Sequence, residues 1–121
     1  MAFTVTSSKI TCAVTTTTAI ANIQNSGTGV FAYITYTGGD ETGIYIAPSV
    51  IEPNISSSTY YQYVKSDSSF ALTALKYSIT ADGSYRIPIT TGLGETKLKL
   101  TFSAISGTAN GTIDVEIRGG E

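Results

Sequence analysis

The chain has 121 residues, which suits one domain with a hydrophobic core, and we predict a single domain over residues 1–121. Hydrophobic residues make up 41% of it, charged residues only 13%, and the net charge is −2. This balance excludes the basic patch of a nucleic-acid-binding protein, and no run approaches the ~20 apolar residues of a membrane helix. We therefore expect neither nucleic acid nor membrane as a partner.

Charged residues are distributed unevenly along the chain. None occurs from Ile10 to Gly39, whereas the segment from Glu95 to the end carries seven. Two interpretations of the uncharged stretch stay open. It forms a sandwich face with little charge, or it is covered by another subunit, because depletion of charge marks the centre of protein interfaces.

Segments with a period of two residues are predicted along the first third of the chain. Alternation places successive side chains on opposite faces, which is typical of a strand. Strands are expected over residues 3–6, 9–15, 19–24 and 30–37, with a bend at 15–18 and a turn at 25–29. The segment 30–37 offers apolar residues on both faces, so one of them needs a cover from a loop or a partner. Its two faces are Val30, Ala32, Ile34 and Tyr36, and Phe31, Tyr33, Thr35 and Thr37.

The middle of the chain alternates between loops and shorter strands. We expect an exposed loop at 38–43, a short strand at 44–46 that Pro48 stops, and an irregular connection to residue 58. A strand follows at 59–65. The pattern over 70–79 shifts phase, which a β-bulge near Thr73 and Ala74 would reconcile. After a turn at Asp82 and Gly83, Pro88 requires an edge strand or a strand end.

The last part of the chain shows the strongest alternation. Residues 97–104 and 112–118 are predicted to pair as a hairpin, with a turn at Gly107-Thr108 preferred to one at Asn110-Gly111. The preferred turn sets Lys99 opposite Glu116. In either case the same six residues face inward and form the centre of the core: Leu98, Leu100, Phe102, Ile113, Val115 and Ile117. The whole pattern predicts an all-β, antiparallel β-sandwich or jelly roll of about eight or nine short strands.

The residues that carry most enzyme chemistry are missing. The chain has no histidine and a single cysteine, which excludes zinc sites, thiol–imidazole pairs and an internal disulfide. We expect Cys12 to be a small buried hydrophobe. Asp40-Glu41 and Asp67 have no specific spacing for paired-carboxylate catalysis or for calcium. We therefore predict no catalytic site, no cofactor and no metal.

Tyrosines are the remaining candidates for binding. Tyr60, Tyr61 and Tyr63 crowd one strand, and tyrosine combines apolar area with a polar tip, as interfaces and sugar platforms need. The alternative is that Tyr61 and Tyr63 belong to the core while Tyr60 is half exposed. The absence of tryptophan disfavours a carbohydrate-binding module, which stays the second hypothesis. The predicted partner interface comprises Phe31, Tyr33, Thr35, Tyr60, Tyr61 and Tyr63.

The composition and the closing strands also resemble a known group of proteins. The start at Met1-Ala2-Phe3-Thr4-Val5, the abundance of Thr, Ser and Gly, and residues 85–89, 98–102 and 111–117 are similar to small virion proteins of tailed bacteriophages. The resemblance implies a β-sandwich that serves as a capsid decoration (cement) protein, or as a neck, tail or fibre component. It implies protein subunits of a capsid or tail as partners, and homo-oligomerisation. The first residues lack the pattern of a signal peptide, so we expect synthesis in the host cytoplasm and a place in the virion.

Overall fold

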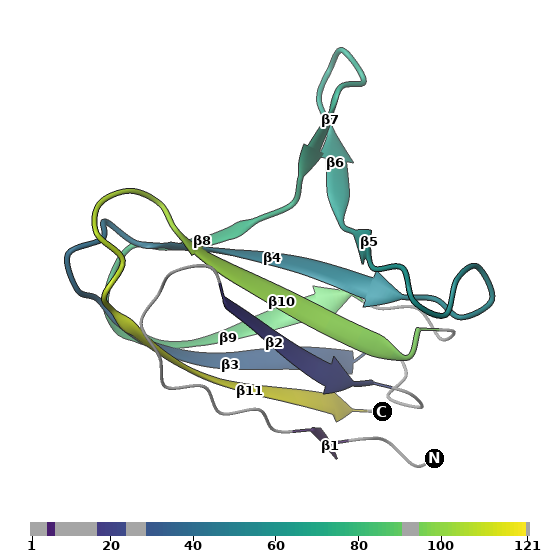
Figure 1. Cartoon of the computed structure of the whole chain (residues 1–121), viewed down its shortest axis with the longest axis horizontal. Coiled ribbons are helices and arrows are strands. Elements are labelled where there is room, and N and C mark those ends of the chain that lie inside the picture. The colour runs from purple at the N-terminus through teal and green to yellow at the C-terminus, as the bar shows by residue number, and fades with distance from the viewer. Residues whose placement is uncertain (1–4, 7–16, 24–28, 91–94, 121) are drawn as a thin grey trace.

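Two antiparallel sheets face each other in the computed structural model, which describes residues 5–6, 17–23, 29–90 and 95–120 (Figure 1). Sheet I has the order β1-β11-β3-β9. Sheet II has the order β2-β10-β4-β5, and β8 also pairs with β4. Two further strands, β6 and β7, pair with each other. The strands are β1 (Val5–Thr6), β2 (Thr17–Asn22), β3 (Gly29–Thr37), β4 (Ile44–Ile51), β5 (Tyr61–Gln62), β6 (Val64–Ser66), β7 (Leu72–Ala74), β8 (Tyr77–Ile79), β9 (Gly83–Thr90), β10 (Lys97–Ala104) and β11 (Thr112–Gly120).

The core lies between the two sheets and is built from every second residue of the long strands. From sheet I, β3, β9 and β11 contribute buried Val, Ile, Ala and Tyr side chains, and β2, β4 and β10 face them from sheet II. All six residues predicted at the centre are buried, which confirms the inward face of the closing segments. The all-β antiparallel sandwich is therefore confirmed, while the narrower assignment as a jelly roll stays a prediction. Eleven strands are described rather than eight or nine, because several are only two or three residues long.

The predicted closing hairpin is wrong, although its inward residues are right. β10 pairs with β2 and β4 in sheet II, whereas β11 pairs with β1 and β3 in sheet I. Residues 105–111 thus cross from one sheet to the other, and Lys99 lies opposite Ile20 and Ser49, not Glu116. Alternation reports which side chains point into the core but not whether they meet within one sheet or across the sandwich. Both arrangements bury the same residues.

Pro48 does not end its strand, contrary to the sequence expectation. β4 continues to Ile51 and pairs with β10 along its whole length. The carbonyl of Pro48 accepts a hydrogen bond from the amide of Tyr63 at 3.2 Å, so the side of Pro48 that lacks an N–H faces away from β10. On that side β8 pairs with β4 up to Ile46 and β5 begins at Ser49. The proline therefore sits where the neighbouring edge strand is interrupted.

The interruption is a projecting hairpin, which we call the arm (residues 63–76). β4 pairs with β8 and then with β5, and only Ala47 and Pro48 separate these two pairings along β4. On the partner side, residues 63–76 lie between β5 and β8. Within the arm β6 pairs with β7, and the amide of Leu75 donates to the carbonyl of Tyr63 at its base. In Figure 1 the arm rises from sheet II, away from both sheets. The alternating pattern over residues 70–79 shifts by one position because β7 belongs to the arm and β8 belongs to sheet II, so the predicted β-bulge is wrong. The predicted continuous strand at 59–65 is also wrong, since β5 and β6 are separate strands.

Other sequence expectations have mixed outcomes. Pro88 lies in β9, which forms the edge of sheet I in the described part of the chain, as its missing N–H requires. Thr17 and Thr18 belong to β2 and pair with β10, so the predicted bend does not include them. The whole of the predicted strand at 9–15, which contains Cys12, and residues 25–28 of the predicted turn at 25–29 lie outside the described residues.

Candidate interaction surfaces

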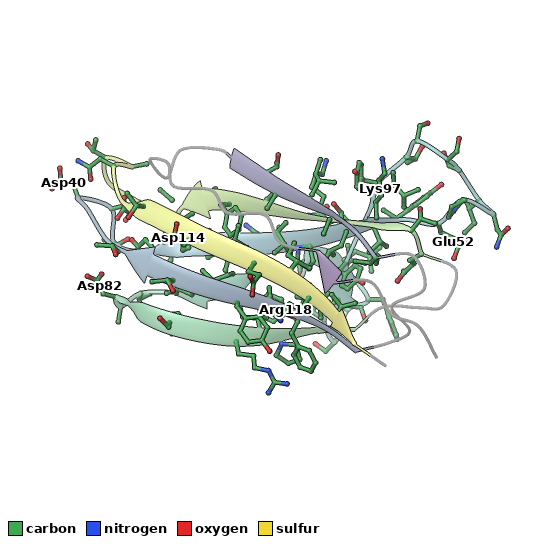
Figure 2. All side chains as sticks on the ribbon, turned by 90° about the horizontal axis from the view of Figure 1, so that it is seen from below. Asp40, Glu52, Asp82, Lys97, Asp114 and Arg118 are labelled. Atoms are coloured by element: carbon green, nitrogen blue, oxygen red, sulfur yellow. The ribbon has the colours of Figure 1, made fainter. Side chains whose placement is uncertain are left out.

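The outer face of sheet I carries aromatic and charged side chains in cross-strand rows. Tyr33 on β3 lies between Glu116 on β11 and Arg86 on β9. In the next row Thr35 lies between Asp114 and Ser84. No described segment covers these rows, and Tyr33 is 38% exposed. Figure 2 shows the carboxylate of Asp114 and the side chain of Arg118 on this outer side of β11.

These two rows line an open groove of about 540 Å³, called the sheet I groove, with Tyr33, Thr35, Ser84, Arg86, Asp114 and Glu116 among its lining residues. Its β11 wall is acidic and its β9 wall is basic. The Arg86 guanidinium stacks on the Phe31 ring with 3.9 Å between its central carbon and the ring centroid. The Nε of Arg118 donates to Oε1 of Glu116 at 2.6 Å. The groove is thus an ordered polar and aromatic surface of the kind that interfaces use.

The three tyrosines of the predicted interface lie on the other sheet. The Lys99 ammonium lies 4.2 Å from the centroid of the half-buried Tyr60 ring, on the outer face of sheet II. Tyr61, on the edge strand β5, is 44% exposed and is not a core residue. Tyr63 packs against the core at the base of the arm, and burial raises the pKa of its hydroxyl. The structure therefore brings Phe31, Tyr33 and Thr35 together and separates them from Tyr60, Tyr61 and Tyr63.

The arm carries three of the seven large hydrophobic side chains that are exposed among the described residues. Val64 and Leu72 are 48% and 70% exposed. The register pairs Val64 with Ala74 and Ser66 with Leu72, so all four share one face of the hairpin, while Lys65 and Thr73 share the other. An isolated two-stranded hairpin is only marginally stable in water. Within the described part of the chain, the face of the arm that carries Val64 and Leu72 is therefore left to solvent.

Phe70 at the tip of the arm has an unusual backbone conformation. Its side chain is 86% exposed and its φ is 63°, in the left-handed region that glycine normally occupies in hairpin loops. The turn is held by Asp67, whose Oδ1 accepts the amides of Ser69 at 2.8 Å and Ala71 at 3.1 Å. A left-handed residue other than glycine costs roughly 1–2 kcal/mol. The loop therefore presents an aromatic ring to solvent at a conformational cost, which is the pattern of a functional position.

A buried carboxylate organises the loops at one end of the sandwich. Glu41 is 7% exposed, and its oxygens accept the Tyr36 hydroxyl at 2.6 Å and the amides of Gly39 at 2.5 Å, Asn110 at 2.9 Å and Gly111 at 2.7 Å. The hydroxyl of Tyr36 and then the amide of Gly39 contribute most to lowering the pKa of Glu41 to about 2, against the opposing effect of burial. The loop at 38–43 is therefore anchored by Glu41 rather than exposed throughout.

The same loop end uses a second polar pair and a glycine. The amide of Asp40 donates to Oδ1 of Asn110 at 2.7 Å, and Nδ2 of Asn110 donates back to Oδ2 of Asp40 at 2.8 Å. Gly107 has a φ of 89°, and a Cβ there would lie 2.7 Å from the carbonyl oxygen of Asp40. The Gly107 that suggested a hairpin turn instead allows the crossing loop to approach the neighbouring loop. Asp40, Glu41 and Asp67, the carboxylates considered for calcium, all accept hydrogen bonds from the protein.

Sequence reasoning missed Phe70 and Leu72 as surface residues. The two residues are two positions apart, so the alternating pattern predicts that both lie on the buried face of a strand. The structure shows instead that they are exposed, because β7 belongs to the arm and the chain rejoins sheet II only at β8. The positively charged wall of the groove was also missed, because Arg86 comes from a strand distant in sequence. Among the described residues, no three His, Cys, Asp or Glu side chains gather as metal ligands would. The same residues include no helix of a length and hydropathy that would span a membrane.

Comparison with known protein families, with curated proteins and with solved structures found no match to this chain.

Proposed function

We propose that this chain is a non-enzymatic structural protein that attaches to protein subunits of a virion, as a capsid decoration protein. The observation that carries the proposal is the arm, a hairpin that holds Val64, Phe70 and Leu72 in solvent. Full burial of such side chains contributes roughly 1.5–3 kcal/mol each. A fold that leaves three of them on one projecting element therefore gains most when that element docks on another protein.

The order in which the strands enter the two sheets supports the same proposal. Sheet I contains β1, β3, β9 and β11, and sheet II contains β2, β4, β5, β8 and β10. If the two-residue β5 and the arm are left aside, the chain passes from one sheet to the other at every step except from β4 to β8. We infer from this order that the sandwich is a jelly roll of eight principal strands. Jelly rolls are used by viral capsid domains and also by lectins. The resemblance of the closing strands to small phage virion proteins favours the capsid role.

The arm fits the energetics of a reversible attachment. Its two strands pair only with each other within the described part of the chain, and its base is joined to sheet II through Tyr63 and Leu75. Docking on a partner would cover the apolar face and stabilise a hairpin that is marginal alone. The low share of charged residues in the chain, 13%, limits the hydration lost when neighbouring surface is covered.

A small carbohydrate-binding module is the second candidate, and the sheet I groove favours it. Tyr33 presents an exposed ring beside Arg86, Asp114 and Glu116, and aromatic platforms flanked by charged groups can stack on and hydrogen-bond a sugar. This function needs only the groove and leaves the arm without a role. The two candidates therefore predict different sensitive residues.

Sedimentation with particles tests the proposal. The tagged protein is mixed with the particle fraction of its source, and bound protein is measured across a density gradient. We expect saturable binding that Phe70→Asn weakens, because asparagine tolerates the left-handed conformation but removes the ring. Ile55→Asn is the matched control, since Ile55 is a large hydrophobic residue that is 70% exposed, compared with 86% for Phe70, but lies in the loop between β4 and β5, outside the arm. Absence of particle binding, together with saturable binding of an oligosaccharide that Tyr33→Ala abolishes, would support the second candidate instead.

A further inference from the structure

We infer that the arm of one copy of this chain inserts its Phe70 tip into the sheet I groove of a second copy. This inference rests on the proposed structural role and names a second copy of this chain as the protein subunit that receives the arm. Two features on the same chain carry it. One is the exposed ring of Phe70 at the tip of the arm, and the other is an open groove lined by Tyr33 that no described segment covers.

The two features cannot meet within one molecule. The arm rises from the edge of sheet II, while the groove lies on the outer face of sheet I, with the whole sandwich between them (Figure 1). Contact between them must therefore join two molecules. Because each copy uses two different surfaces, the contact is head-to-tail, and a repeated contact makes a ring when the rotation closes or an extended array when it does not.

The chemistry of the tip matches that of the groove. Phe70 offers one exposed ring. The groove offers the Tyr33 ring beside the Arg86 guanidinium, which stacks on Phe31. Aromatic and cation–π contacts both favour an inserted phenylalanine at this place. The polar face of the arm adds Lys65, and the β11 wall of the groove presents Asp114 and the carboxylate of Glu116, which also accepts from Arg118. An orientation that places Lys65 along β11 pairs opposite charges across the contact.

A second copy is also an electrostatically acceptable partner. The net charge of −2 on each chain gives only weak repulsion between copies. The contact itself is small, since it consists of one hairpin tip in one groove, and small interfaces are weak in isolation. Closure of the head-to-tail contacts into a ring raises the effective concentration and strengthens such a contact without new residues.

Mixing two complementary variants tests the contact. Phe70→Asn removes the tip, and Thr35→Arg fills the groove with a long side chain from an exposed position on β3. We expect the wild-type protein to form concentration-dependent oligomers in sedimentation velocity, and each variant alone to associate about tenfold or more weakly. An equimolar mixture should form a heterodimer and nothing larger, because only the arm of Thr35→Arg and the groove of Phe70→Asn are intact.

Controls separate this contact from other modes of association. Ser84→Arg fills the same groove from β9 and should behave as Thr35→Arg does, while Ile55→Asn should associate as the wild type. Circular dichroism and thermal unfolding establish that each variant is folded. A wild-type protein that stays monomeric at all concentrations, or a mixture that stays monomeric while the wild type associates, overturns the inference. If particle binding persists in that case, the proposed function stands and only the head-to-tail contact fails.

Discussion

Replacement of Glu41 by glutamine should destabilise the protein more than any other loss of a single charge on a loop. The carboxylate accepts four hydrogen bonds, from the Tyr36 hydroxyl and three backbone amides, and is almost fully buried. Glutamine would turn an amide NH₂ towards two of these donors and leave them without an acceptor. Each buried donor that loses its partner costs about 1–3 kcal/mol. We expect Glu41→Gln to lower the free energy of unfolding by about 2–4 kcal/mol at pH 7.

The pH dependence of this effect has a definite sign. The pKa of Glu41 is lowered from 4.5 to about 2 in the folded state, so the carboxylate stabilises the fold fully above pH 4.5. The contribution is lost as the pH falls from about 4.5 towards 2. A displacement of this size corresponds to about 3 kcal/mol, and screening by solvent near the loop reduces it to about 2–3 kcal/mol.

Urea unfolding of the wild type and Glu41→Gln at pH 7, 5, 3 and 2 measures both quantities. The difference in unfolding free energy should be largest at pH 7 and should shrink by about 2–3 kcal/mol on going to pH 2. Glu52→Gln is the matched control, because the side-chain carboxylate of Glu52 accepts one backbone amide, that of Asn54 at 3.2 Å, and the change should alter stability by about 0.5 kcal/mol or less. A difference between wild type and Glu41→Gln that stays constant from pH 7 to pH 2 would refute the assigned role of the carboxylate.

Three further predictions concern the core, the arm and metal ions. Phe102→Ala should lower the free energy of unfolding by about 3–5 kcal/mol, because Phe102 is fully buried between the sheets; a loss under about 1 kcal/mol in urea unfolding would contradict its position. Phe70→Asn should stabilise the arm by about 0.5–1 kcal/mol, because asparagine adopts the left-handed conformation with less strain. Amide hydrogen exchange at Asp67, whose N–H donates to the carbonyl of Ala71, should slow by the corresponding factor. Faster exchange would show that the ring stabilises the arm. Calcium should leave the melting temperature unchanged, and a rise that a chelator reverses would reveal a site.

The sequence alone determined which residues face the core. Alternation in β10 and β11 identified their buried side chains, because a strand with one face on a core must repeat every two residues wherever its neighbours lie. In β3 the same period separated two faces, but both are apolar, so the sequence did not decide which of them is buried. Pro88 restricted its segment to an edge strand or a strand end, because proline cannot donate to a second neighbouring strand, and the structure places it within the edge strand β9 of the described sheet. Fold class follows from the same local rules, and it did not depend on which strands pair.

Only the tertiary structure decided how these strands are paired. β10 and β11 have the pattern of a hairpin, yet they belong to opposite sheets, and burial is equally satisfied in both arrangements. The competing hydrogen bonds come from β2, β3 and β4, which are far away in sequence. The site of Glu41 has the same origin, because its amide donors at Asn110 and Gly111 come from a loop about 70 positions later.

The candidate sites divide in the same way. Phe31, Tyr33 and Thr35 could be placed on one face from the period of their strand, but Arg86 and Asp114 join them only through the register of three strands. The exposure of Phe70 was hidden, because a local pattern of apolar residues predicts a core strand whether or not the chain returns to the sheet. The arm leaves sheet II beside Ala47 and Pro48 and returns at β8. That excursion removes its apolar face from the core, and it depends on contacts between distant segments that no local pattern encodes.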